Sequence, residues 1–201
     1  MLQSRLIFVE GIMGSGKSTT ARWLARLLRR NGIPAYAVPE ALPHPTIVFR
    51  TLPHWKQPWR DMTADTLIAQ SVRNWQAFVT RSITQPSIVV FDGQLFHGDV
   101  TALLLMGCPL PTLQEYVLSL VCLLQPLHPH LIYFYQDNVA QALDVIGTKR
   151  GADWVASQVA WKVTSPYAQQ HGWHGIDGWK HLYLQYRQLT DAWVVQLPSP
   201  P

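Results

Sequence analysis

Short apolar runs recur along the chain, and longer stretches with helical spacing separate them. Four of these runs stand at residues 6–9, 35–38, 88–91 and 131–135. A continuous apolar run of this length is typical of a strand that is covered by helices on both faces. Residues 192–197 form a further apolar run and predict a last strand. The pattern therefore predicts an α/β fold, with a central parallel sheet of about five strands flanked by helices.

The first helical stretch runs from residue 17 to residue 30 and ends at Asn31-Gly32, with Leu24, Leu27 and Leu28 on one side. Further helices are predicted over 61–81, twice within 100–127, from about 138, and two or three times more before 190. In the helix over 61–81, the residues expected to face the core are Leu67, Ile68, Val72, Trp75 and Phe78 or Val79. Residues 41–60 hold several prolines and no steady period, which predicts a long loop with room for one short element.

The composition is that of an ordinary folded domain. Hydrophobic residues make up 48% of the 201 residues and charged residues 14%, which excludes a disordered or linker protein. Since the chain has no repeat and no linker-like segment, residues 1–201 are predicted to form one domain. The net charge of +4 favours an anionic ligand and is too small to indicate nucleic acid. Arg22, Arg26 and Arg29 line one side of the first helix, and we expect a solvated helix face there rather than a nucleic-acid contact.

Cys108 and Cys122 lie in apolar stretches without the spacing of a metal site or a redox motif, so both are expected to be buried free thiols. This cysteine usage fits a reducing compartment, and the N-terminus lacks the apolar segment of a signal peptide, which predicts a cytoplasmic protein. Pro109 and Pro111 help divide the apolar stretch 100–127 into pieces shorter than the ~20 residues of a spanning helix. No membrane association is therefore expected, while a homodimer face on this stretch stays open.

Residues 11–18 read Gly-Ile-Met-Gly-Ser-Gly-Lys-Ser and fit the phosphate-binding pattern GxxxxGK(S/T) between a predicted strand and a predicted helix. Glycines allow successive backbone N–H groups to point at phosphate oxygens, and the start of the helix adds partial positive charge. Lys17 is expected to reach the β- and γ-phosphates of ATP, and the Ser18 hydroxyl to ligate Mg²⁺. The predicted nucleotide-binding residues are Gly11, Ile12, Met13, Gly14, Ser15, Gly16, Lys17, Ser18 and Thr19.

Two carboxylates follow predicted strands, at the edge of a parallel sheet where ligands bind. Asp92 suits the acid that holds Mg²⁺, and the alternative is a turn residue, because Asp92-Gly93 is also a turn signal. Glu40 suits a base that accepts a proton from a substrate hydroxyl, and the alternative is an exposed carboxylate at the start of a loop. The sequence does not decide which of the two is the base. Glu10 is expected to support the loop geometry by hydrogen bonding.

Together these residues resemble the P-loop nucleoside and nucleotide kinases, the family that holds thymidylate kinases and deoxynucleoside kinases. The resemblance is close over residues 6–20 and looser at Val38-Pro39-Glu40, at Phe91-Asp92-Gly93 and over residues 133–151. It implies a P-loop NTPase fold with a helical lid at about 137–165 and an acceptor-binding region at about 41–86.

The resemblance also implies roles for single residues. Glu40 would be the base, and Arg150, with Lys149 second, would be a lid cation that binds ATP and stabilises charge in the transition state. The alternative for this pair is an ordinary basic helix end. The chain departs from the family at Gly93, where an arginine is usual, and in having one Lys149-Arg150 pair in place of several spaced arginines.

Residues 53–60 interleave aromatic and basic side chains in the implied acceptor region. In one interpretation, Trp55 or Trp59 would stack on an aromatic acceptor, and Lys56 or Arg60 would bind an anion. In the other, the tryptophans would anchor the loop by packing against the core, which is the stapling alternative. On the next helix, Arg73 is a hypothetical replacement for the arginine absent at position 93, with Gln70 and Asn74 facing the same pocket. Zinc is not expected, because no spacing of a closed zinc site is found among His128, His130, His171, His174 and His181.

The leading hypothesis is a small-molecule kinase in which Mg·ATP donates its γ-phosphate to an acceptor held under residues 41–81. Its catalytic residues would be Lys17, Glu40, Asp92 and Arg150. A nucleoside or nucleotide is the expected acceptor, and another small alcohol is the second choice. The alternative is an NTP-binding switch or regulatory ATPase with a protein partner, although the chain has no Asn-Lys-x-Asp guanine motif. A nucleic-acid-associated ATPase is a third class, supported only by the arginine row.

Overall fold

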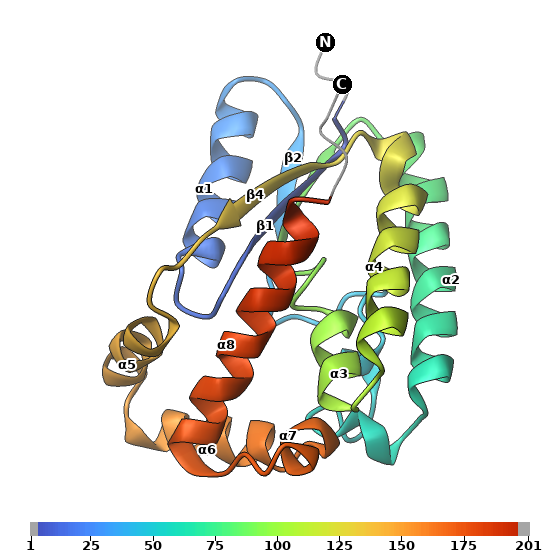
Figure 1. Ribbon diagram of the computed structural model, residues 1–201. Helices are drawn as coiled ribbons and strands as arrows, with labels where there is room; N and C mark the ends of the chain where they lie inside the picture. Colours follow the sequence, from blue (N-terminus) through green and yellow to red (C-terminus); the bar gives the residue numbers. More distant parts are fainter. Residues whose placement is uncertain (1–3, 197–201) are drawn as a thin grey trace.

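A computed structural model describes residues 4–196 and shows an α/β architecture around one parallel sheet (Figure 1). The strands are β1 (Leu6–Gly11), β2 (Ala35–Val38), β3 (Ile88–Asp92) and β4 (His130–Phe134), in the order β2-β3-β1-β4. All neighbouring pairs are parallel, and Phe8 of β1 lies opposite Phe91 of β3 and Leu131 of β4. The four internal apolar runs therefore form strands, as predicted.

The predicted fifth strand is wrong. Residues 192–194 continue helix α8 (Gly175–Val194), and Leu197 lies outside the described residues. The buried residues of α8 follow a helical period and are Gly178, Trp179, Leu182, Tyr183, Tyr186, Thr190 and Trp193. Trp193 packs on Phe96 with ring centroids 6.2 Å apart, so the apolar end of the chain enters the core as a helix turn. A short apolar run does not distinguish a strand from the end of a buried helix.

The remaining helices follow the predicted order closely. They are α1 (Lys17–Arg30), α2 (Ala64–Ile83), α3 (Asp99–Leu105), α4 (Leu110–Leu124), α5 (Val139–Arg150), α6 (Ala152–Val163) and α7 (Pro166–Gln170). The loop over 41–60 holds two 3₁₀ turns, η1 (Phe49–Thr51) and η2 (Pro58–Arg60), where one short element was expected, and a third, η3 (Gln125–Leu127), follows α4. No helix within residues 4–196 is long and apolar enough to cross a membrane.

Alternate residues of the central strand face the two helix layers. Ile7 and Val9 pack against α1 through Ala21 and Ala25, whose small side chains let the helix approach the sheet closely. Leu27 of α1, expected to face the core, is 38% exposed because the contact face is centred on these alanines.

Leu6 and Phe8 point to the opposite face, where α2, α3, α4 and α8 supply the larger core. The stretch 100–127 forms two helices, α3 and α4, with most of α3 buried, as expected. Cys108 is buried, but Cys122 is exposed, so the expectation of two buried thiols is half wrong. Cys122 follows buried Val121 on α4 and lies on the outer side of that helix, since the buried residues Leu120, Val121 and Leu124 define the inner side.

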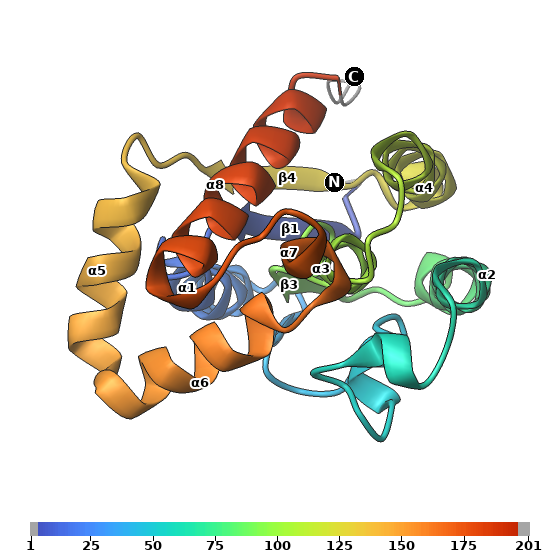
Figure 2. The same cartoon turned by 60° about the horizontal axis from the view of Figure 1, so that its bottom comes forward.

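Helices α5, α6 and α7 gather below the carboxyl ends of the strands (Figure 1), and α5 and α6 wrap around that end of the molecule (Figure 2). Gly151 is the single residue that joins α5 to α6, and its φ of +92° favours glycine. The strand ends, α5 and α6 contribute to the walls of the site described next.

Candidate functional site

The glycine-rich loop connects the end of β1 to the first residue of α1. Gly14 and Gly16 have φ of +82° and +101°, a conformation that residues with a side chain rarely adopt. A Cβ at Gly11 would lie 2.7 Å from the carbonyl oxygen of Phe134, so only glycine fits where β1 leaves the sheet beside β4. Gly16 caps α1 without a side-chain acceptor, and the first turn holds no acid. The first N–H groups of α1 and the positive end of its dipole are therefore open to an anion.

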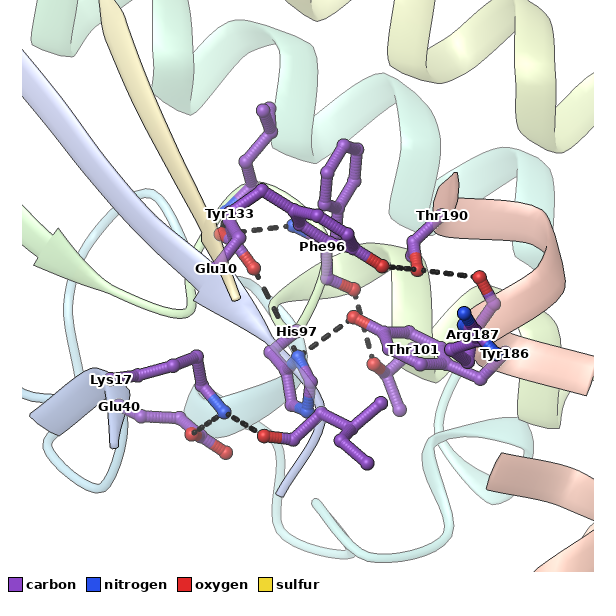
Figure 3. A network of polar contacts seen from close by, with 12 residues as sticks. Glu10, Lys17, Glu40, Phe96, His97, Thr101, Tyr133, Tyr186, Arg187 and Thr190 are labelled. Atoms are coloured by element: carbon purple, nitrogen blue, oxygen red, sulfur yellow. Dashed lines mark hydrogen bonds and ion pairs between the residues drawn. The ribbon is translucent and has the colours of Figure 1, made fainter. Parts of the chain in front are cut away.

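Lys17 is nearly buried at the base of this loop. Its Nζ donates a hydrogen bond of 3.0 Å to the carbonyl oxygen of Ile12 and lies 3.9 Å from Glu40 Oε2 (Figure 3). Ser18 and Thr19 are exposed, and Ser15 Oγ is buried without a hydrogen-bond partner among the described residues. The loop thus holds one ammonium group and two accessible hydroxyl groups at the start of a helix.

A cavity of about 650 Å³ opens at this loop and extends along the carboxyl end of the sheet. The predicted site residues that line it are Met13, Gly14, Gly16, Lys17, Ser18, Thr19, Glu40, Asp92 and Arg150, together with Lys149. Gly11, Ile12 and Ser15 do not line the cavity and belong to the inner side of the loop. One cavity therefore brings together predicted site residues from four separate segments of the chain.

Two acids stand side by side in this cavity. Asp92 ends β3, and its Oδ2 accepts a 3.5 Å hydrogen bond from the backbone N–H of Glu40, while its Oδ1 is buried without a partner among the described residues. Burial raises the pKa of Glu40 above its ordinary value, the nearby Lys17 ammonium opposes this rise, and Asp92 adds to it. A carboxylate of raised pKa beside an ammonium suits the acceptance of a proton near neutral pH.

Gly93 explains the absence of an arginine after Asp92. Its φ is +68°, and a Cβ there would lie 3.1 Å from Lys17 Cε and 3.3 Å from Glu40 Oε2. A side chain at this position would displace both groups. The hypothesis that Arg73 replaces the missing arginine is wrong, because Arg73 is exposed on α2 and does not line the cavity.

Arg50 is the arginine at this end of the cavity, and sequence reasoning missed it. Asp99 anchors the segment before it, since its carboxylate accepts hydrogen bonds from the backbone N–H groups of Val48 (3.2 Å) and Phe49 (3.1 Å). Ser71 Oγ donates a third bond of 2.6 Å to the same carboxylate. Burial raises the pKa of Asp99 to about 6, against these three bonds. The anchor directs the 48–50 backbone so that Arg50 reaches the cavity.

Lys162 is the second cation that sequence reasoning missed. It is buried on α6 and lines the cavity together with Trp154, Gln158 and Trp161. These four positions are spaced i, i+4, i+7 and i+8 and therefore lie on one face of the helix. The signal in the sequence was that Gln158 and Lys162 share this face with two tryptophans. The pKa of Lys162 is lowered to about 7, chiefly by burial; the Glu40 carboxylate opposes this shift, and the Arg50 charge adds to it.

Residues 53–60 contribute less than the sequence suggested. Trp55 lines the cavity, carries the Arg50 guanidinium 4.4 Å above its ring and meets Trp161 edge-on with centroids 5.1 Å apart. Lys56 and Arg60 are exposed and do not line this cavity, so neither holds an anion there. Trp59 packs against the core, as the stapling alternative expected.

A buried polar network lies behind the cavity (Figure 3). Glu10 Oε1 accepts hydrogen bonds from the backbone N–H groups of Leu95 (2.6 Å) and Phe96 (3.2 Å), and Glu10 Oε2 lies 3.9 Å from His97 Nδ1. Burial raises the pKa of Glu10 to about 8, opposed first by Lys17. Glu10 therefore supports a loop, as expected, but the loop is the one that follows β3.

His97 continues this network into the cavity wall. Its Nδ1 lies 2.7 Å from the hydroxyl of Tyr186, and burial and the Lys17 ammonium lower its pKa well below the ordinary value. The imidazole is therefore neutral at physiological pH.

The histidines of the C-terminal third form no metal site. No group of three or more His, Cys, Asp or Glu residues that could hold a metal ion occurs in the described part of the chain.

In comparisons with known proteins, no family model matches the chain and no curated protein matches it.

Proposed function

We propose that this protein is a Mg-ATP-dependent kinase of the P-loop nucleoside and nucleotide kinase type, which transfers a γ-phosphate to a hydroxyl acceptor. One observation supports this proposal most strongly: a single cavity is lined by the glycine-rich loop, two strand-end acids and the basic end of α5. The cavity then continues toward Arg50 and Lys162, which leaves room for an acceptor beyond the phosphates. A nucleoside- or nucleotide-like acceptor is the first expectation, with other small alcohols as the second.

The phosphates of ATP would lie on the glycine-rich loop. The open N–H groups at the start of α1 and the Lys17 ammonium are donors that fit phosphate oxygens. Lys17 would exchange its bond with the Ile12 carbonyl for a bond to phosphate, so its charge is held ready beside the reacting group. Lys149 and Arg150 line the same end from α5 and would neutralise charge that develops on the transferred phosphoryl group.

Mg²⁺ fits the donors present, because Asp92 Oδ1 is a buried oxygen without a partner within residues 4–196 and Ser18 offers a hydroxyl in the same cavity. Mg²⁺ usually takes one or two protein carboxylates and keeps water and phosphate ligands, so a larger acidic cluster is not required. When bound, the ion would neutralise phosphate charge.

Glu40 is the proposed base. The acceptor hydroxyl would give its proton to the Glu40 carboxylate while its oxygen forms a bond to the γ-phosphorus. The bond from the γ-phosphorus to the β–γ bridging oxygen breaks, and ADP leaves with that electron pair. The contact between Lys17 Nζ and Glu40 Oε2 supports this role, because the carboxylate lies next to the ammonium group that would bind phosphate.

The test is an ATP-consumption assay with Mg²⁺ against nucleosides, nucleotides and hydroxylated small molecules, with products identified by mass. A compound that gains one phosphate supports the proposal, and Glu40→Gln should then lower kcat by about 10²-fold or more with little change in the KM for ATP. If ATP binds but every compound is recovered unmodified and phosphate is released slowly, the protein is a regulatory ATPase instead. Lys17→Met is the matched variant that should abolish ATP binding in either case.

A further inference from the structure

Two cations at the acceptor end of the cavity have no partner. Neither Arg50 nor Lys162 forms a hydrogen bond or an ion pair through its side chain with another residue of the described range 4–196. Lys162 is only 4% exposed, and Arg50 is half-buried. Each guanidinium or ammonium group lies only over an aromatic ring, Arg50 over Trp55 at 4.4 Å and Lys162 over Trp161 at 3.6 Å.

The charge balance at this end is positive. Glu40 is the one carboxylate that affects the titration of both cations, and it is already shared with Lys17. Arg50 and Lys162 also repel each other, because the Arg50 charge lowers the pKa of Lys162. A buried ammonium without a counter-ion is costly, and an anion placed between the two cations would remove that cost.

The phosphates of ATP do not account for these two groups. The nucleotide end has its own donors in the loop, Lys17, Lys149 and Arg150. Arg50 comes from the loop after β2 and Lys162 from the second half of α6, and both are placed with Trp55 and Trp161. A neutral nucleoside would leave both cations unpaired, and a cationic alcohol would be repelled.

From this arrangement we infer that the acceptor is an alcohol that carries its own anionic group, a phosphate or a carboxylate, bound by Arg50 and Lys162 while its hydroxyl faces Glu40. The inference rests on the proposed function for the phosphoryl transfer and names the substrate class of that site. The anion is held and is not the nucleophile, since Glu40 removes a proton that only the hydroxyl carries. Planar bidentate contact from Arg50 and a point charge from Lys162 suit either anion.

Binding is tested first, with inorganic phosphate and acetate as probes of the two anion types. Calorimetric titrations use the protein saturated with Mg²⁺ and a non-hydrolysable ATP analogue, and are repeated on Lys17→Met without nucleotide so that the result does not depend on ATP binding. Arg50→Met and Lys162→Met should each weaken binding of the preferred anion by about tenfold or more. Lys56→Met, an exposed lysine of the same region that does not line the cavity, should leave it unchanged.

Turnover is tested next, with alcohols that differ only in the anion. Thymidine is compared with thymidine 3′-monophosphate, and 4-hydroxymethylbenzamide with 4-hydroxymethylbenzoate, each with Mg·ATP. The anionic member should be the better acceptor in at least one pair, with an advantage in kcat/KM that Lys162→Met removes. Thermal melting of each variant establishes that it is folded. Lys162→Arg should retain part of the preference for the anionic acceptor, because arginine keeps the positive charge at this position.

The outcomes separate the two claims. Anion binding that is equal in wild type, Arg50→Met and Lys162→Met, or absent from all of them, overturns the inference. Efficient phosphorylation of neutral alcohols with no effect of either variant overturns it too, while the kinase proposal stands. Anion binding that depends on both cations without any phosphoryl transfer keeps the anion site and removes the kinase proposal.

Discussion

Glu10 offers the sharpest test of the electrostatics beneath the site, and the change is Glu10→Gln. The carboxyl group is buried and accepts two backbone hydrogen bonds through Oε1, whereas Oε2 has no hydrogen-bond partner in the part of the chain that the structure describes. Glutamine keeps the accepting oxygen and the shape of the side chain. The substitution therefore removes the ionisation and leaves the packing of the loop after β3 in place.

The magnitude follows from the pKa of Glu10, which burial raises from 4.5 to about 8 in the folded protein. Between these values the unfolded chain has lost the proton and the folded chain retains it, so the free energy of unfolding falls as the pH rises through this window. Below about pH 4.5 both states are protonated and the penalty is absent. From about pH 5 to about pH 7.5, this one group should reduce the free energy of unfolding by about 3 kcal/mol in wild type.

Urea unfolding of wild type and Glu10→Gln over this pH range measures the effect. The difference in the free energy of unfolding between the variant and wild type should grow in favour of glutamine by about 3 kcal/mol toward high pH. Groups that do not interact with Glu10 titrate alike in both proteins and cancel in the difference. A difference that stays constant with pH would show that Glu10 is already ionised in the fold, and the account of its burial would be wrong.

Three further substitutions test other parts of the molecule. Gly93→Ala should lower kcat in a kinase assay by about tenfold or more, because the added Cβ would press on Lys17 and Glu40. The far-UV circular dichroism spectrum should change little. An unchanged kcat would refute this prediction. Asp99→Asn should lower the free energy of unfolding in urea by about 1–3 kcal/mol, because the amide NH₂ would face a backbone N–H donor of Val48 or Phe49. The same variant should weaken anion binding at Arg50. A variant as stable as wild type would argue against the role of Asp99 as an anchor. Leu103→Ala, at a fully buried position of α3, should cost about 2–5 kcal/mol in the same measurement, and a loss below about 1 kcal/mol would mean that the core is loosely packed there.

The sequence predicted those parts of the site whose structure depends on residues close together in the chain. The helix from Lys17 to Arg30 and the strand Ala35–Val38 have the predicted bounds, because each is defined by its own apolar pattern and by the glycines beside it. The carboxyl ends of parallel strands share an edge of the sheet, so the positions of Glu40 and Asp92 directly after two such strands predicted that both lie at this edge.

The two cations beyond them depend on contacts distant in sequence. Arg50 reaches the cavity because Asp99, on another element, binds the backbone before it. Lys162 does so because α6 crosses the carboxyl end of the sheet after Gly151 (Figure 1). No pattern within one segment of the sequence predicts that Arg50 or Lys162 reaches the cavity. The polar positions on the aromatic face of α6 could nevertheless be recognised in the sequence. For the same reason the apolar end of α8 was mistaken for a strand, since Phe96, which Trp193 packs on, lies far away in the chain.

The single-residue joint at Gly151 has a consequence for the order of events in the cavity. Lys149 and Arg150 stand on one side of this joint and Lys162 on the other, and all three line the same cavity. If an anion at Lys149 and Arg150 shifts α5, the start of α6 would move with it across this joint, and an anion at Lys162 would act in the opposite direction. If the two ligands share this joint, each must change the affinity of the other by the same factor. For the proposed kinase, binding of ATP and acceptor should then be cooperative, and hydrolysis of ATP without acceptor should be slow because no anion holds α6.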